Sequence, residues 1–169
     1  MRKIMMMTML LLVTLAANAQ SEVYAYIVDA SGTPTNVRNA PNGKVVQQLD
    51  NEESLVVNLL SAQGNWWRIA PLVEIYGDNE GELTLKGSKS GYWIHNSVLQ
   101  FGVAGDPAGC LRKSPSWKAK AVTIGNSTDM SFRPLAISGQ WVKVVTTDGR
   151  YTGWMHRDKI CSNPLTTCP

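Results

Sequence analysis

The sequence predicts an all-β protein that contains two copies of one small module. Three observations support this fold class. Short runs rich in β-branched and aromatic residues alternate with turn clusters of Gly, Pro, Asn, Asp and Ser. After the first twenty residues, no window shows the 3.6-residue apolar period of an amphipathic helix. Three sequence blocks of the first half recur in the same order in the second half, which indicates a duplication.

The first 19 residues have the features of a secretory signal peptide. Arg2 and Lys3 precede an apolar run over residues 4–15, and Ala17-Asn18-Ala19 provides the small residues that signal peptidases require. The run is shorter than the roughly 20 residues of a membrane-spanning helix, and no later run is long enough to be one. We therefore expect a processed chain that begins at Gln20, has no transmembrane segment, and is periplasmic or extracellular.

Charge and length narrow the function classes. The whole chain has a net charge of +3, from 16 basic and 13 acidic residues. The predicted signal contains two of the basic residues and none of the acidic ones, so 14 − 13 leaves +1 for the rest. A balance this close to zero does not favour nucleic acid as a partner. The remaining length suits one medium domain or two small ones.

The strands of the first copy are short and separated by turns. Residues 29–34 form a turn cluster, and Gly64-Asn65 separates two apolar runs as a tight hairpin requires. The predicted strands span residues 23–28, 45–49, 54–60 and 66–69. Many short strands with such turns favour a small barrel or a sandwich.

The repeated blocks define the two copies. Residues 37–41 match 111–115, and 65–69 match 140–144, with offsets of 74 and 75. Trp93 matches Trp154 with an offset of only 61, so the first copy has 14 additional residues before Trp93. The predicted units are residues 20–102 for the first copy, with an extended hairpin over 70–90, a Gly- and Pro-containing linker over 103–109, and residues 110–169 for the second copy.

The additional residues of the first copy have two interpretations. Residues 72–76 and 82–86 alternate apolar and polar side chains, as the arms of a half-exposed hairpin would. The acidic, Gly-containing tip over 77–81 also suits a mobile loop.

The blocks resemble the bacterial SH3 (SH3b) family. The run Asn36-Val37-Arg38-Asn39-Ala40-Pro41 and the run Gly91-Tyr92-Trp93-Ile94-His95 are similar to the family's N-V-R-x-x-P and G-W-V-H motifs. The second copy is similar at 111–115 and 153–156 but departs from the pattern over 122–135. The resemblance implies two tandem SH3-like barrels of five to six strands. It also implies recognition of cell-wall peptidoglycan or its peptides, or of proteins.

Aromatic and charged side chains are the candidate ligand contacts. Successive residues of a strand point to opposite faces, and Trp67 aligns with Val142, so Trp67 should face the core while Trp66 and its counterpart Trp141 point outward. Trp66 could alternatively cover a loop or the other module. The repeated His and Arg residues could instead have structural roles. The candidate contacts are Trp66, Arg38, Asn39, Tyr76, Tyr92, His95 and Trp141.

The three cysteines fit an oxidising compartment. In an SH3-like barrel the first and last strands are antiparallel, which makes a Cys110–Cys161 disulfide feasible, while Cys168 could compete for either partner. The spacing matches no zinc pattern, and we expect neither metal nor cofactor.

A catalytic function is disfavoured by the motifs. The chain has no nucleophile elbow and no phosphate-binding Gly loop. The sequence therefore predicts a non-catalytic exported binding protein of the cell envelope that recognises peptidoglycan or its stem peptides. The alternative is a protein–protein adaptor or inhibitor that uses the long hairpin of the first copy.

Overall fold

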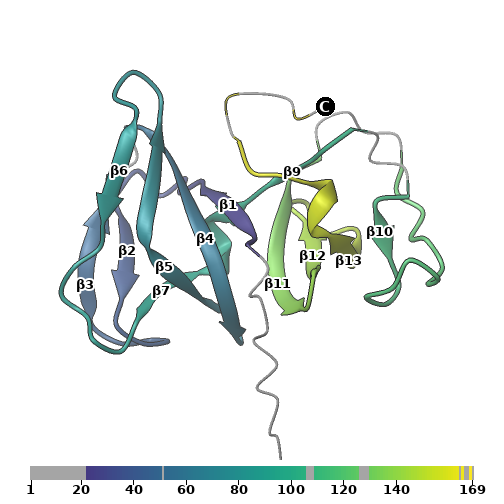
Figure 1. Cartoon of the computed structure of the whole chain (residues 1–169), viewed down its shortest axis with the longest axis horizontal. Coiled ribbons are helices and arrows are strands. Elements are labelled where there is room, and N and C mark those ends of the chain that lie inside the picture. The colour runs from purple at the N-terminus through teal and green to yellow at the C-terminus, as the bar shows by residue number, and fades with distance from the viewer. Residues whose placement is uncertain are drawn as a thin grey trace, which may run out of the picture.

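The fold is all-β, with two 3₁₀ turns (Figure 1). A computed structural model describes residues 22–50, 52–105, 109–125, 130–163, 165 and 168. The elements in chain order are β1 (Tyr24–Ile27), β2 (Thr35–Arg38), β3 (Val45–Leu49), β4 (Ser54–Gln63), β5 (Trp66–Tyr76), β6 (Gly81–Thr84), β7 (Tyr92–His95), η1 (Asn96–Val98), β8 (Leu99–Gln100), β9 (Gly102–Val103), β10 (Leu111–Arg112), β11 (Phe132–Ser138), β12 (Trp141–Thr146), β13 (Thr152–His156), η2 (Arg157–Lys159) and β14 (Ile160–Cys161).

The first half of the chain forms one large antiparallel sheet. Its strand order is β3-β2-β7-β5-β4-β1-β8, and β6 pairs with the distal part of β5. The strands alternate between core and surface: Val37, Trp67, Ile69 and Ile94 are almost completely buried, while the residues beside them are more exposed. This period of two is what a sheet with one covered face requires.

The second half repeats these pairings with the same register. In β5–β7, Trp66 faces His95 and Arg68 faces Trp93. In β12–β13, Trp141 faces His156 and Lys143 faces Trp154. Each copy also has a register shift at the same place, between Leu59 and Ser61 in β4 and between Pro134 and Ala136 in β11. The duplication inferred from the sequence blocks is therefore also present in the strand pairing.

The two copies meet at Gln100–Phe101 without an intervening linker. In the first copy, β8 pairs with β1, and Val28 N donates to Val98 O at 2.8 Å. In the second copy, β14 pairs with β9, and Ala104 N donates to Lys159 O at 2.9 Å. The strand β9 is thus the counterpart of β1. We call residues 22–100 the first module and residues 101–168 the second module.

This boundary reassigns the predicted linker over 103–109. Val103 lies in β9, and residues 104, 105 and 109 occupy the place of the turn cluster that follows β1 in the first module. Residues 106–108 lie outside the described residues, as do the predicted signal over 1–19 and residues 126–129. Glycine and proline are common in turns within a module as well as in linkers between modules. Composition alone therefore could not distinguish a linker from a turn of the second module.

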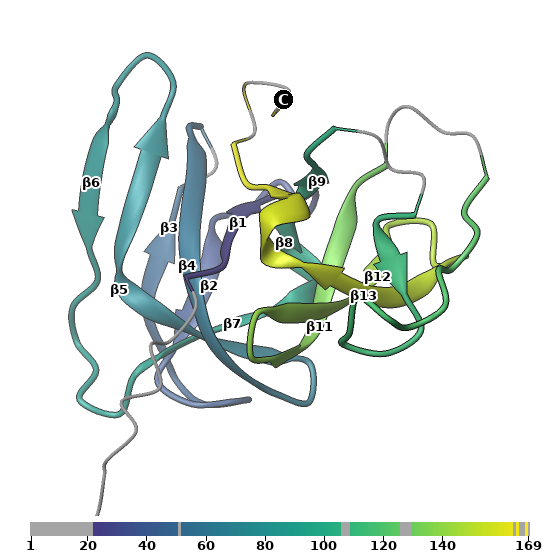
Figure 2. The same cartoon turned by 45° about the vertical axis from the view of Figure 1, so that its right-hand side comes forward.

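The two modules share one hydrophobic core. Buried side chains of both, including Trp67, Leu99 and Phe132, belong to a single cluster. Phe101 and Phe132 exchange two backbone hydrogen bonds. The indole Nε1 of Trp67 donates to Pro134 O at 3.2 Å, so β11 of the second module packs directly on the first. Figure 2 shows β11 beside β4.

Strand pairing within the described residues closes neither sheet into a barrel. The first sheet ends at β3 and β8, and the second, with the order β10-β13-β12-β11, ends at β10 and β11. The segment 72–84 forms a paired hairpin, in which Val73 faces Leu83 and Glu74 faces Glu82. Figure 1 shows this hairpin projecting at one end of the molecule. No helix among the described residues is long and apolar enough to cross a membrane.

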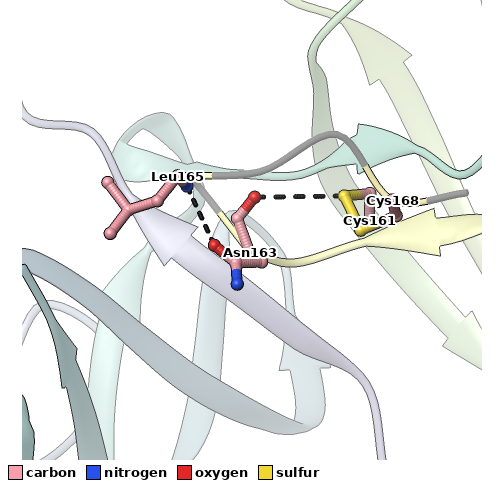
Figure 3. Close-up of a disulfide and its surroundings, with 4 residues drawn as sticks. All are labelled: Cys161, Asn163, Leu165 and Cys168. Atoms are coloured by element: carbon pink, nitrogen blue, oxygen red, sulfur yellow. Dashed lines mark hydrogen bonds between the residues drawn. A yellow bond between two sulfur atoms is a disulfide. The ribbon is translucent and has the colours of Figure 1, made fainter.

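A disulfide joins Cys161 to Cys168, with the two Cα atoms 5.5 Å apart (Figure 3). It closes a short segment against β14, where a sulfur of the bridge lies 3.9 Å from the carbonyl oxygen of Asn163. Cys110 is buried and is not part of this bridge. Of the pairings left open by the sequence, the structure therefore has Cys161 with Cys168, seven residues away, and not the feasible Cys110–Cys161 bridge.

Candidate binding site

The outer face of the first module presents two rows of aromatic and basic side chains. One row runs across β2, β7 and β5 as Arg38, Trp93 and Arg68. The next row contains His95 and Trp66, which are directly paired. These residues share a face because each is separated by one buried residue from its neighbour on the same strand. The face is therefore set by strand register.

Trp66 is the centre of this surface. Its ring lies 5.1 Å from the His95 ring, edge to face. The Arg38 guanidinium carbon lies 5.7 Å from the Trp66 ring centroid, within the range of a cation–π contact. Arg38 Nη1 also donates to Gly43 O at 2.7 Å. The guanidinium is thereby held over the indole by the turn that follows β2.

His95 is oriented by the turn it begins. Its Nδ1 accepts a hydrogen bond from Ser97 N at 3.3 Å and lies 2.8 Å from Ser97 Oγ. Because Nδ1 is an acceptor, the neutral ring carries its proton on Nε2. His95 therefore caps η1 with one nitrogen, which leaves the other edge of the ring for the outer face.

A pocket of about 150 Å³ opens beside Trp66, Arg38 and His95. Its other lining residues are Asp29, Thr35, Asn36 and Val98. Since a water molecule occupies about 30 Å³ in the liquid, this space holds roughly five waters. It is large enough for a small polar group, such as a peptide terminus.

Asp29 supplies a fixed negative charge to the pocket. The Ser31 hydroxyl and backbone N–H, together with the Thr35 hydroxyl, hold the pKa of the Asp29 carboxyl below its usual value, against a smaller opposite effect of burial. Thr35 Oγ1 donates to Asp29 Oδ2 at 2.9 Å. Asp29 is therefore ionised at neutral pH, and the pocket offers a carboxylate, a guanidinium and an indole together.

The other candidates of the first module lie elsewhere. Tyr92 is 9% exposed and donates its hydroxyl to Leu85 O at 2.9 Å, which makes it a core residue. Tyr76 donates to Glu74 Oε2 at 2.9 Å on the hairpin, and this bond is the main reason its pKa is raised. Asn39 lies in the turn after β2, where its carbonyl accepts from Ser90 Oγ. None of these three lines the pocket.

The equivalent place in the second module is covered. Trp141 lies on the outer face opposite His156, as Trp66 lies opposite His95, but it is only 8% exposed. Trp117, from the turn after β10, packs on it with ring centroids 4.8 Å apart, and lies 4.7 Å from the His156 ring. The turn that contains Trp117 is two residues longer than its counterpart in the first module, because Lys113 N donates to Lys120 O whereas Asn39 N donates to Lys44 O. A large side chain in this longer turn covers Trp141.

A second, larger pocket lies between β3 and the long hairpin. It encloses about 440 Å³ and combines the apolar residues Leu55, Ile75 and Leu83 with the carboxylates of Asp50, Glu52 and Glu53. Asn79 at the hairpin tip donates to Glu53 Oε1 at 2.7 Å. This bond ties the tip to the pocket rim.

Sequence reasoning missed Asp29 and Trp117. Asp29 belongs to a turn cluster, and its place beside Trp66 follows from strand pairing that brings β2 next to β7. The signal for Trp117 was a tryptophan in a polar, lysine-containing turn, where an aromatic side chain has no local reason to be. Among the described residues, no group of three or more His, Cys, Asp or Glu side chains could hold a metal ion.

Comparison with models of known protein families and with curated proteins gives no match for this chain.

Proposed function

We propose that the chain is an exported, non-catalytic binding protein of the cell envelope, and that the first module binds the stem peptides of peptidoglycan. In this proposal both modules are SH3-like barrels of the bacterial SH3 type, which the motifs around Arg38 and Trp93 resemble. The disulfide between Cys161 and Cys168 supports export, because disulfides persist in oxidising compartments.

The observation that carries the proposal is the charge arrangement of the 150 Å³ pocket. A stem peptide has free carboxylate and ammonium groups within a few bonds of each other. Arg38 can pair with the carboxylate and Asp29 with the ammonium, since each is held in place by hydrogen bonds of its own. A small apolar side chain between these termini packs on the Trp66 ring.

Titration of the purified chain (residues 20–169) with a synthetic stem peptide tests this function. Binding should shift the Trp66 indole N–H signal in a ¹H–¹⁵N spectrum. Trp66→Ala, Arg38→Gln and Asp29→Asn should each weaken binding about tenfold, the effect of losing roughly 1.4 kcal/mol. Trp117→Ala in the second module is the control and should leave the affinity unchanged.

A peptide with an amidated C-terminus separates the roles of the two charges. The unaltered chain should bind the amidated peptide more weakly than the peptide with a free carboxylate. Arg38→Gln should bind the two peptides equally, whereas Asp29→Asn should still prefer the free carboxylate. The proposal is rejected if folded Trp66→Ala binds the stem peptide as tightly as the unaltered chain, or if the unaltered chain does not bind purified sacculi above a control protein at low salt.

The second candidate function, a protein–protein adaptor or inhibitor, is favoured by the acidic pocket beside the hairpin. Three carboxylates around an apolar floor suit a basic amphipathic segment of a partner. Removing the hairpin is a poor test, because Val73 and Leu85 are buried core residues. Changing Asp50, Glu52 and Glu53 to Asn or Gln should instead abolish binding of a Lys- and Leu-rich peptide, and unchanged binding would reject this candidate.

A further inference from the structure

The two modules carry opposite net charges. Between residues 22 and 100 the chain has nine Asp or Glu and five Lys or Arg, and between 101 and 169 it has four and nine. The differences are 5 − 9 = −4 and 9 − 4 = +5. The net charge of the whole chain is therefore close to zero although the second module is strongly basic. The separation of acidic and basic residues between the modules influences which ligands approach each of them.

The turn between β10 and residue 121 concentrates this positive charge. It contains Lys113, Lys118 and Lys120 and no acidic residue. The turn is ordered by its own bonds, because Lys113 N donates to Lys120 O at 3.0 Å and Lys118 N donates to Ser116 Oγ at 3.2 Å. This backbone bond places Lys113 and Lys120 opposite each other, so that their exposed side chains start from neighbouring positions.

The two carboxylates of the second module that lie among the described residues are engaged elsewhere. Asp148 pairs with Arg150, and Asp158 lies 3.3 Å from His156 Nδ1 and 3.5 Å from Arg157 Nε. Within the described part of the chain, no carboxylate forms an ion pair with any of the three turn lysines. No described carboxylate therefore competes with an external anion for these ammonium groups.

Trp117 gives this basic turn a flat apolar platform. Its side chain is 54% exposed although it packs on both Trp141 and His156. These two rings are 8% and 7% exposed and lie 5.0 Å apart, so they form a rigid support. The platform thus combines a fixed orientation with an open surface, which limits the entropy lost on binding.

We propose that the Trp117 platform and its lysines form a second binding site, for a carboxylate-bearing polysaccharide. The apolar face of one sugar ring packs on the exposed indole, and its carboxylate and those of neighbouring sugars contact Lys113, Lys118 and Lys120. This site is independent of the peptide pocket of the first module.

The platform fits a sugar better than the other anionic partners. Trp117 is the only large exposed apolar residue of its turn, which is too little apolar surface for insertion into a membrane interface. Single-stranded nucleic acid is usually held by several aromatic rings on which successive bases stack, whereas the described residues of this turn offer one. A single ring with cations around it matches one saccharide unit in a charged chain.

Affinity electrophoresis of the purified chain (residues 20–169) in gels containing polygalacturonate tests the proposal, with neutral dextran gels as the reference. The unaltered chain should be retarded by polygalacturonate only, and salt should weaken the retardation. Trp117→Ala and the triple variant Lys113→Gln, Lys118→Gln, Lys120→Gln should each weaken binding about tenfold. Trp117→Phe, which retains an aromatic ring, should keep most of the binding to polygalacturonate.

The matched control is Lys44→Gln, Lys86→Gln, Lys89→Gln, which removes the same charge from the first module. It should bind polygalacturonate like the unaltered chain. Equal losses in both triple variants, or full binding by folded Trp117→Ala, would reduce the site to non-specific charge attraction and overturn the proposal. Sedimentation with anionic phospholipid vesicles, or a shift of single-stranded DNA, without retardation by polygalacturonate would also overturn it.

Discussion

The first and second modules use the same strand register to build opposite surfaces. In both, a Trp–His pair lies across two neighbouring strands, at Trp66 with His95 and at Trp141 with His156. In the first module the short turn after β2 leaves Trp66 beside a small pocket, whereas in the second module the longer turn after β10 carries Trp117, which covers Trp141. The comparison shows that a longer turn with one aromatic side chain can convert a recess into a platform while the register of the neighbouring strands stays the same.

The same contrast extends to the far end of the sheet. In the first module, the connection from Ile69 to Trp93 contains the long hairpin of β5 and β6. In the second module, the matching connection is a tight turn in which Asp148 accepts from Thr146 Oγ1 at 2.6 Å and from Arg150 N at 3.0 Å. The first module therefore has its additional residues in the hairpin of β5 and β6, whereas the second module has its additional aromatic side chain in the turn after β10.

The largest expected difference between the modules concerns the core position shared by Trp67 and Val142. Trp67→Ala should lower the free energy of unfolding by about 3–5 kcal/mol, because it creates a large cavity and leaves Pro134 O without its indole donor. Val142→Ala removes only two methyl groups and should lower it by about 2 kcal/mol. Urea denaturation measures the free energy of unfolding of both variants. Equal decreases in the two variants would show that Trp67 does not connect the modules.

A smaller effect is expected at the position shared by Tyr92 and Gly153. A Cβ on Gly153 would lie 2.9 Å from Leu111 Cβ and 3.1 Å from Arg112 O, so Gly153→Ala should destabilise by about 1–3 kcal/mol. Tyr92→Phe loses the hydrogen bond to Leu85 and should lose about 1 kcal/mol.

Gly81→Ala is the control for the glycine substitution, because no atom lies within 4 Å of its Cβ position. It should leave the urea midpoint nearly unchanged. A neutral Gly153→Ala would mean that the second module can open enough at β10 to accept a side chain, as the first module does.

The smallest effect concerns the tight turn that replaces the hairpin. The Thr146 hydroxyl, the Arg150 backbone N–H and the Arg150 side chain lower the pKa of Asp148 to about 2. Since this pKa is below the usual 3.8, the ionised group stabilises the fold above about pH 3.8, and this contribution is lost as the pH falls through about 2. Carboxyl ¹³C titration should show this midpoint, and Thr146→Val should raise it. A midpoint near 3.8 in the unaltered chain would contradict the turn geometry.

Local patterns predicted much of the fold. The Gly64-Asn65 turn and the alternation around it predicted the β4–β5 hairpin, and the alignment of Trp67 with Val142 predicted that Trp67 is buried. The long hairpin was one of two readings of residues 72–86, and the paired reading is the observed one. In each case, the information lies in residues that are near one another in the sequence.

The features that were not predicted depend on contacts between distant segments. The covering of Trp141 by Trp117 joins residues 24 positions apart, and the bond from Trp67 to Pro134 spans 67. The position of Asp29 beside Trp66 likewise requires the strand order β2-β7-β5. The module boundary was displaced because a Gly- and Pro-containing segment is expected both in linkers and in turns.

The direct passage from β8 into β9 has a consequence for how the molecule unfolds. Two domains joined by a flexible linker melt independently, but here the connection has no slack, and Phe101 and Phe132 hold the modules together in one core. Opening either module would expose apolar side chains of the other, so partly unfolded states are penalised on both sides. We therefore expect the duplicated chain to unfold as one cooperative unit, and neither half to be stable once it is separated from its neighbour.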